Sequence, residues 1–261
     1  MSFGYVPSQN KIKNLIKRIV GWPAFTRRLQ AATVRKFLRL QKDDIFLDVG
    51  CGGGNYVFEM SRHTRQSVGL EINYGSLAGA TIAQRNFPNV HLICGDGLRL
   101  PLSDSSIDKI LLSGTFQSVQ NDRQLLCECN RVLKPNGIIV ITVISQHVLA
   151  KRIHSGRIYE SFKRWYRQEK LVTRYYGKAE LSKIFLETGF RIVNAKYAPN
   201  QLASAVLDLL NFISFRTGLH FNQRYIFLAF YPLLWLIEKF SKNTQQGNEL
   251  IVSAKKGIAT Q

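Results

Sequence analysis

The chain has 261 residues, of which 45% are hydrophobic, and a net charge of +19. This composition excludes a disordered chain, and the length suits one α/β domain with insertions. Four cysteines without a C-x-x-C pair indicate neither a zinc site nor a disulfide framework, so we expect no metal. The start lacks the charged-then-apolar pattern of a secretory signal, which favours a cytoplasmic protein.

Residues 1–42 form the first distinctive region, with ten Lys or Arg and no Asp or Glu. Apolar residues recur at helical spacing over about 11–20 and 24–40, on either side of Gly21-Trp22-Pro23. A basic amphipathic helix bordered by Trp suits peripheral binding to an anionic membrane, although packing against the core explains the pattern equally well. We expect residues 1–42 to form a basic helical cap on a main domain at 43–257.

A glycine turn follows the first predicted strand, which covers residues 45–49. The turn has the spacing Asp48-x-Gly50-x-Gly52-x-Gly54, and a helix is expected at about 55–64. Its glycines let backbone N–H groups approach a ligand where a Cβ atom would collide. A dinucleotide fingerprint requires G-x-G-x-x-G, which this spacing does not satisfy. An acid two residues before the first glycine suits a cationic ligand that carries an α-amino group.

This turn resembles the first motif of the class I S-adenosylmethionine-dependent methyltransferases, which is acid-x-Gly-x-Gly-x-Gly. Further landmarks of that family follow in order: Glu71, 23 residues after Asp48, then Asp96-Gly97, and a Leu-Lys-Pro-Asn-Gly turn at 133–137. The resemblance implies S-adenosyl-L-methionine as cofactor, with Glu71 at the ribose and Asp96 at the adenine. The cofactor-binding residues that it implies are Asp48, Gly50, Gly52, Gly54, Glu71, Ile72, Asp96, Gly97 and Ser113.

The predicted elements alternate between strand and helix, which indicates a doubly wound, mostly parallel sheet. We expect strands near 45–49, 67–71, 90–93, 108–113, 138–144, 190–197 and 248–255. Helical patterns lie between them at about 55–64, 75–86, 121–133 and 179–188. The last strand resembles the antiparallel seventh strand of the family. The fold class is therefore α/β, a seven-stranded Rossmann-like methyltransferase sheet with helical insertions.

Two insertions interrupt this alternation, at 145–178 and 198–247. Residues 150–183 contain ten Lys or Arg and three Glu, so with residues 1–42 they carry 17 of the 19 net positive charges. Residues 225–237 hold no charge, and these 13 residues are too few to span a bilayer, which needs about 20. That segment suits a core helix, a dimer contact or a shallow membrane insertion. An apolar pocket there would suit a lipid-like acceptor, and simple burial is the other interpretation.

The catalytic group is the least defined part of the sequence. Methyltransferases of this type that act on phenolic hydroxyls often carry an acid–His pair after the fourth strand. Here Gln117 and Ser118 occupy those two positions, which argues against His-assisted or metal-assisted O-methylation at this loop. His147, just beyond the fifth strand, is the substitute base that we expect.

Three functions fit these features. The first is methylation of a small-molecule or lipid-like acceptor, at the cytoplasmic face of a membrane. The second is RNA methylation, with the basic segments binding phosphates; the loop after the fourth strand lacks the Asn/Asp-Pro-Pro-aromatic signature of base-amine methylation, which disfavours it. The third is a non-catalytic binding module with a methyltransferase-like fold. The sequence leaves the oligomeric state open.

Overall fold

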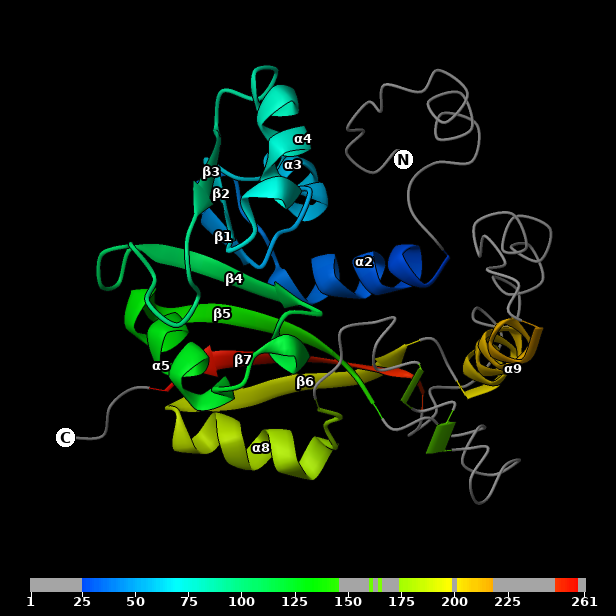
Figure 1. Ribbon diagram of the computed structural model, residues 1–261. Coiled ribbons are helices and arrows are strands. Elements are labelled where there is room, and N and C mark those ends of the chain that lie inside the picture. The colour runs from blue at the N-terminus through cyan, green and yellow to red at the C-terminus, as the bar shows by residue number, and fades with distance from the viewer. Residues whose placement is uncertain are drawn as a thin grey trace.

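A computed structural model of the chain describes residues 25–145, 160–161, 164–165, 174–198, 201–217 and 247–257. Its strands form one seven-stranded sheet in the order β3-β2-β1-β4-β5-β7-β6, with helices on both faces (Figure 1). The strands are β1 (Ile45–Val49), β2 (Gln66–Glu71), β3 (Val90–Cys94), β4 (Ile107–Ser113), β5 (Leu133–Ile144), β6 (Phe190–Ala198) and β7 (Glu249–Lys256). All seven predicted strands are therefore confirmed.

The described helices also follow the predicted order. They are α2 (Phe25–Leu38), α3 (Asn55–Met60), α4 (Tyr74–Gln84), the 3-10 helix η1 (Phe116–Ser118), α5 (Asp122–Val132), α8 (Lys178–Glu187) and α9 (Gln201–Thr217). Helix α3 ends four residues before the expected boundary, where the Thr64 hydroxyl donates to the Met60 carbonyl at 3.0 Å. Helix α9 lies in the predicted insertion between β6 and β7. None of these helices has the length and hydropathy needed to cross a bilayer.

The strand order and directions predict a ligand site at the centre of the sheet. Strands β1 to β5 are parallel, whereas β7 runs antiparallel to β5 and to β6, as predicted. The chain reverses its direction of travel across the sheet between β1 and β4. In open α/β sheets ligands bind at such a switch point, outside the carboxyl ends of the strands. The loops after β1 and β4 therefore border the expected site.

The two faces of the sheet bury separate apolar clusters because successive strand residues point to opposite sides. Phe46 packs with α2 in one cluster, and its neighbour Leu47 lies in the other, with residues of α5 and α8. Val34 of α2 is fully buried against this first face. Helix α2 is thus a layer of the sheet core, and its apolar stripe packs there. The basic helix expected at about 11–20 lies outside the described residues, so the choice between membrane contact and core packing stays open for it.

One local prediction was wrong. A turn was expected over residues 134–137, with a strand only from 138, but β5 already begins at Leu133. Ile107 pairs with Leu133, whereas Lys109 pairs with Ile138, so the register shifts across the intervening residues. Asn136 takes a φ of +63° there. The Pro-Asn-Gly sequence thus makes a bulge inside the strand instead of a turn before it.

Candidate active site

The glycine turn after β1 depends on backbone conformation more than on side chains. The Gly50 and Cys51 N–H groups both donate to the Leu70 carbonyl, at 2.7 and 3.0 Å, which joins the turn to the end of β2. Gly50 has a φ of +74°, and a methyl group on it would lie 2.2 Å from the Thr115 hydroxyl oxygen. Only glycine adopts this positive φ without strain and leaves room for the Thr115 side chain. The turn after β1 and the loop after β4 are therefore in close contact.

Glu71 connects the same turn to the start of α4. Its Oε2 accepts from the Gly52 N–H and its Oε1 accepts from the Asn73 N–H, both at 2.9 Å. A carboxylate has about four lone-pair positions, so these two bonds leave capacity for the two hydroxyls of a ribose. Methyl groups built on Gly52 or Gly53 would meet no atom within 4 Å. The space before the turn thus fits the cofactor that the resemblance implies.

Two buried groups lie beneath this turn. Asp48 is only 2% exposed at the end of β1. Burial, followed by the negative charges of Asp48 and Glu71, raises the pKa of the Cys51 thiol well above its usual range. The thiol therefore stays protonated at neutral pH and is no nucleophile.

The loop after β3 supplies the third side of the site. The Asp96 Oδ1 accepts from the Leu98 N–H at 2.9 Å, which turns the chain beside the end of β2. A methyl group on Gly97 would lie 2.9 Å from Val49 and 3.0 Å from Leu125, so this position requires glycine for close packing. Ile72 is 69% exposed, an unusual degree for isoleucine, and it follows the proposed ribose acid directly. An adenine ring lying over it would cover that side chain.

Helix α5 holds the continuation of this loop. The Arg131 guanidinium donates to the Leu100 and Leu102 carbonyls, at 2.9 and 2.8 Å. It also pairs with Glu128, whose Oε2 accepts from the Leu100 N–H at 2.8 Å. Asp104 is a second acidic partner at 2.7 Å. Arg131 lies two residues before the family landmark at 133–137, and no pattern in the sequence indicates these contacts.

The loop after β4 explains why the acid–His pair is missing. The Gly114 N–H donates to both the carbonyl and the hydroxyl oxygen of Thr142 at 3.1 Å. Gln117 is buried, and its Oε1 accepts from the Ile144 N–H at 2.5 Å. The Ser118 hydroxyl donates to the Gly114 carbonyl at 3.4 Å. The Gln117 side chain thus holds the loop against β5, and the Ser118 side chain closes the loop on itself.

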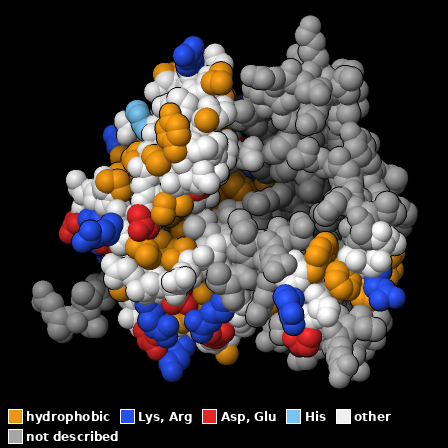
Figure 2. All heavy atoms as spheres, in the orientation of Figure 1, with side chains coloured by type: hydrophobic (Ala, Val, Ile, Leu, Met, Phe, Trp, Pro, Cys, Tyr) orange, Lys and Arg blue, Asp and Glu red, His pale blue; other side chains and the backbone are white. Residues whose placement is uncertain are grey.

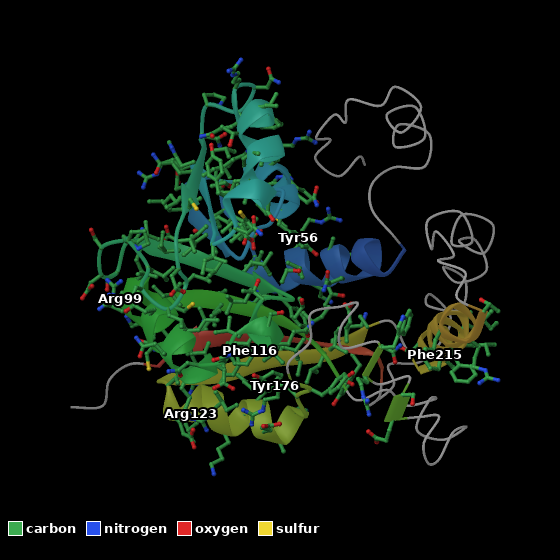
Figure 3. The ribbon with its side chains drawn as sticks, viewed as in Figure 1. Tyr56, Arg99, Phe116, Arg123, Tyr176 and Phe215 are labelled. Carbon is green, nitrogen blue, oxygen red and sulfur yellow. The ribbon has the colours of Figure 1, made fainter. Side chains whose placement is uncertain are left out.

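A buried acid that the sequence did not reveal supports the same loop. The Tyr176 hydroxyl donates to Asp122 Oδ2 at 2.9 Å, and its ring packs against Phe116 at 5.0 Å between centroids (Figure 3). The Arg174 guanidinium lies 5.2 Å from the Tyr176 ring centre. Burial and then the hydrogen bond to Asp122 raise the pKa of Tyr176 far above its usual range. This hydroxyl is therefore a structural donor.

A second buried polar group, which we call the Gln30 network, comprises Gln30, Tyr56, Thr142 and Glu249. The Gln30 Nε2 donates to the Thr142 hydroxyl at 2.8 Å and to Glu249 Oε2 at 3.0 Å. The Tyr56 hydroxyl donates to Gln30 Oε1 at 3.1 Å. These residues come from α2, α3, β5 and β7, and no spacing in the sequence links them. Sequence reasoning therefore missed them.

An aromatic cluster lies at the end of β5. Trp165, Phe212 and Phe215 belong to one partly buried apolar group with Ile144, the last residue of that strand. The Trp165 and Phe215 ring centroids lie 5.8 Å apart, and those of Phe212 and Phe215 lie 6.1 Å apart. These rings come from the two predicted insertions, which meet beyond the carboxyl end of the strand.

The structure gathers the predicted cofactor residues at one edge of the sheet. Asp48, Gly50, Gly52, Gly54, Glu71, Ile72, Asp96, Gly97 and Ser113 all lie at or just after the carboxyl ends of β1 to β4. Their contact with the cofactor stays a prediction. His147 lies outside the described residues, as does the segment 225–237. The described residues contain no cluster of three His, Cys, Asp or Glu side chains able to hold a metal ion.

Comparison with known sequences assigns the central part of the chain. Residues 47–141 match the sequence family described as a methyltransferase domain. Demethylmenaquinone methyltransferase of Staphylococcus aureus (strain JH9) is 29% identical over 173 residues, covering 60% of this chain and 72% of that protein.

Solved structures agree on the fold at lower identity. The chain resembles the [4+2]-cyclase SpnF with a TM-score of 0.61 at 18% identity, covering 88% of this chain and 80% of that one. It also resembles Haemonchus contortus phosphoethanolamine N-methyltransferase 2, crystallised with S-adenosylhomocysteine, with a TM-score of 0.62 at 19% identity, covering 91% of this chain and 53% of that one. Since one of these proteins is a cyclase, the fold alone does not decide the reaction.

Proposed function

Because the chain is a class I S-adenosylmethionine-dependent methyltransferase, we propose that it methylates a small apolar acceptor with an aromatic ring, of the quinone kind, at an anionic membrane surface on the cytoplasmic side. S-Adenosyl-L-methionine supplies a sulfonium methyl group that is already electrophilic. The protein therefore has to bind the donor, orient the acceptor in line with it and exclude water.

The aromatic cluster carries this proposal. Trp165, Phe212 and Phe215 gather beyond the carboxyl end of β5. Ser113 ends the neighbouring strand β4, and Gly114 follows it. In this fold the methyl group is expected beside those two strand ends. Ligand sites are concave and mostly apolar, and flat ring systems pack well against aromatic side chains. An apolar ring is thus the acceptor that this edge of the sheet suits best.

The Staphylococcus aureus relative supports the same class of acceptor, because its name gives demethylmenaquinone as its substrate. At 29% identity the two proteins need not share one substrate, and we propose only the quinone-like chemical class. In this chain Glu71 would hold the ribose, and Asp96 with the following backbone would hold the adenine. The Gly52 N–H and its neighbours would lie along the amino-acid part of the cofactor.

The membrane part of the proposal rests on charge and on α9. The two basic segments of the sequence carry most of the net charge of +19, which attracts anionic lipid headgroups. On α9, Leu209 is 50% exposed and Ile213 is 37% exposed, and Arg216 lies in the last turn. Figure 2 shows hydrophobic side chains on the viewed surface of this part of the molecule. Apolar and basic groups together suit the lipid–water interface.

The test of the acceptor uses purified protein, methyl-labelled S-adenosylmethionine and two substrate fractions, a membrane lipid extract and total RNA. We expect label in the lipid extract, and none when Asp96→Ala replaces the wild type. Glu187→Gln, at a surface ion pair with Arg123, is the control that should keep full activity. Label that is removed by RNase would overturn the proposal in favour of RNA methylation. Cofactor binding without label in either fraction would indicate a non-catalytic module.

The test of the membrane contact is sedimentation with vesicles. We expect binding to vesicles with phosphatidylglycerol, weaker binding to pure phosphatidylcholine, and release in high salt. The double variant Leu209→Glu, Ile213→Glu should bind several-fold more weakly. Leu186 of α8 is 76% exposed, so Leu186→Glu provides a matched control that should leave binding unchanged. Equal binding of all three proteins would argue against α9 as the contact.

A further inference from the structure

The Gln30 network is a set of buried polar side chains between α2 and the sheet, where apolar side chains would be expected. Gln30 and Tyr56 are buried, at 4% and 5% exposure, and Thr142 is 1% exposed. Burying hydrogen-bonding side chains costs free energy unless each is paired, and apolar residues would pack α2 on the sheet as well. The network instead ends in a carboxylate, that of Glu249, at the carboxyl edge of the sheet.

On one side the network connects to the predicted cofactor site. The Thr142 hydroxyl oxygen accepts from the Gly114 N–H at 3.1 Å. Thr115, which follows Gly114 in the chain, donates its hydroxyl hydrogen to the Gly50 carbonyl at 3.4 Å. Gly50 belongs to the glycine turn. Each link from this turn to Gln30 is thus a hydrogen bond or a single step along the chain. The position of Glu249 is set through Gln30 relative to the loops that border the cofactor.

On the other side Glu249 adjoins the aromatic cluster. Glu249 pairs with Ile144 in the antiparallel register of β5 and β7, and residues directly opposite in such a pair point to the same face of the sheet. Ile144 is the member of the cluster that belongs to the sheet. The carboxylate thus adjoins both the Gln30 network and the apolar group that contains Ile144. Tyr56 and Phe215, one residue from each group, are labelled in Figure 3.

We propose that Glu249, oriented by Gln30, accepts a hydrogen bond from a hydroxyl group of the methyl acceptor while the aromatic cluster holds its ring. The inference rests on the proposed function and narrows it, because it makes the substrate a hydroxylated aromatic ring. A carboxylate is the strongest hydrogen-bond acceptor among side chains and suits a hydroxyl donor. Glu249 would thus recognise the acceptor hydroxyl. The loop after β4 has no acid–His pair that could do so.

Gln30 orients the Glu249 carboxylate toward the proposed acceptor. Its amide donates to Glu249 and accepts from Tyr56, so the side-chain amide is held in one orientation. A carboxylate held by a fixed donor loses less rotational freedom when it binds a ligand, which favours affinity. Gln30 and Tyr56 are thus positioning residues, and Glu249 is the residue that contacts the acceptor.

Binding of two model rings tests the proposal without relying on turnover. The probes are 1-naphthol, which has a hydroxyl donor, and 1-methoxynaphthalene, which lacks one, titrated calorimetrically in the presence of S-adenosylhomocysteine. Wild-type protein should bind 1-naphthol about fivefold or more tightly than 1-methoxynaphthalene. Glu249→Gln should weaken 1-naphthol binding about fivefold and change 1-methoxynaphthalene binding less than twofold. Tyr56→Phe should move 1-naphthol binding in the same direction by a smaller factor.

Glu187→Gln, the same substitution at a surface ion pair of α8, is the matched control and should bind both probes as the wild type does. Unchanged affinity of S-adenosylhomocysteine would show that Glu249→Gln is folded. Equal 1-naphthol binding by wild type and Glu249→Gln would overturn the inference and leave the proposed apolar acceptor intact. A wild-type protein that binds S-adenosylhomocysteine but neither probe would overturn both the inference and the proposed acceptor class.

Discussion

The two halves of the candidate active site are built in different ways. The proposed cofactor half comprises the short loops after β1, β2 and β3, within residues 45–98, and its key contacts join backbone N–H groups, as at Gly52 and Asn73, to the Glu71 carboxylate. The proposed acceptor half comprises the Gln30 network and the aromatic cluster. Its contacts are made by side chains from α2, α3, β5, α9 and β7.

This difference has a physical reason. The cofactor is the constant ligand of this fold. We expect backbone groups to recognise it, at glycine positions where few other residues fit. The acceptor is the variable ligand of the fold, and side chains carried on insertions can change without disturbing the sheet. The cofactor half should therefore respond to changes in backbone conformation, and the acceptor half to changes in single functional groups.

The largest effect is expected for Gly50→Ala, which tests the dependence of the cofactor half on backbone conformation. A side chain at φ +74° is strained, and its methyl group would lie 2.2 Å from the Thr115 hydroxyl oxygen. We expect the free energy of unfolding to fall by about 2–4 kcal/mol, measured by urea denaturation. Gly52→Ala, at φ +53° with no atom within 4 Å, should cost only about 1–2 kcal/mol. Equal losses would show that contact with Thr115 is unimportant.

Arg131→Met comes next and tests whether α5 supports the cofactor half. The substitution keeps the apolar stem but removes the guanidinium donor from the Leu100 and Leu102 carbonyls, of which, among the described residues, only Leu100 keeps another donor, the Leu102 N–H. We expect a loss of about 2–3 kcal/mol in the free energy of unfolding and weaker binding of S-adenosylhomocysteine by calorimetry. Arg123→Met removes a more exposed arginine with ion pairs and should cost less than about 1 kcal/mol. Normal cofactor affinity in Arg131→Met would argue against this support.

Glu71→Ala tests a side chain of the cofactor half that joins two segments of the site. The variant loses the acceptor of the Gly52 and Asn73 N–H groups and the predicted partner of the ribose. We expect binding of S-adenosylhomocysteine to weaken by about 1–3 kcal/mol, which calorimetry measures directly. Glu71→Gln keeps one acceptor oxygen and should lose less. A folded Glu71→Ala protein with wild-type affinity would refute the assignment of the ribose site.

The smallest effect concerns the side chains beneath the loop after β4. Tyr176→Phe removes the hydrogen bond to Asp122 and should cost about 1 kcal/mol near neutral pH. Burial and Asp122 raise the pKa of Tyr176, so above about pH 10 the unfolded chain loses this proton first. Wild-type stability should therefore fall as the pH rises above that value, and less steeply in Tyr176→Phe. Identical slopes in urea denaturation from pH 8 to 10.5 would contradict this.

Most of the fold could be predicted because its signals are local. Strand and helix periods, the glycine spacing after β1 and the acid at the end of β2 each depend on residues close in the chain. The exception is instructive: Pro135, Asn136 and Gly137 predicted a turn but form a bulge in β5. The pairing of Ile107 with Leu133, which decides the start of the strand, is a tertiary contact that no local pattern contains.

The sequence by itself determined the seven strands, their succession along the chain and, through the family resemblance, the set of residues expected at the cofactor edge. Periodicity selects strand or helix, and parallel strands necessarily bring their carboxyl ends to one edge. Only the tertiary structure decided which side chains meet beyond β5. Gln30 and Glu249 are separated by 219 positions, yet they share a hydrogen bond of 3.0 Å because α2 and β7 pack on the same part of the sheet. Such contacts depend on packing, which residue spacing does not encode.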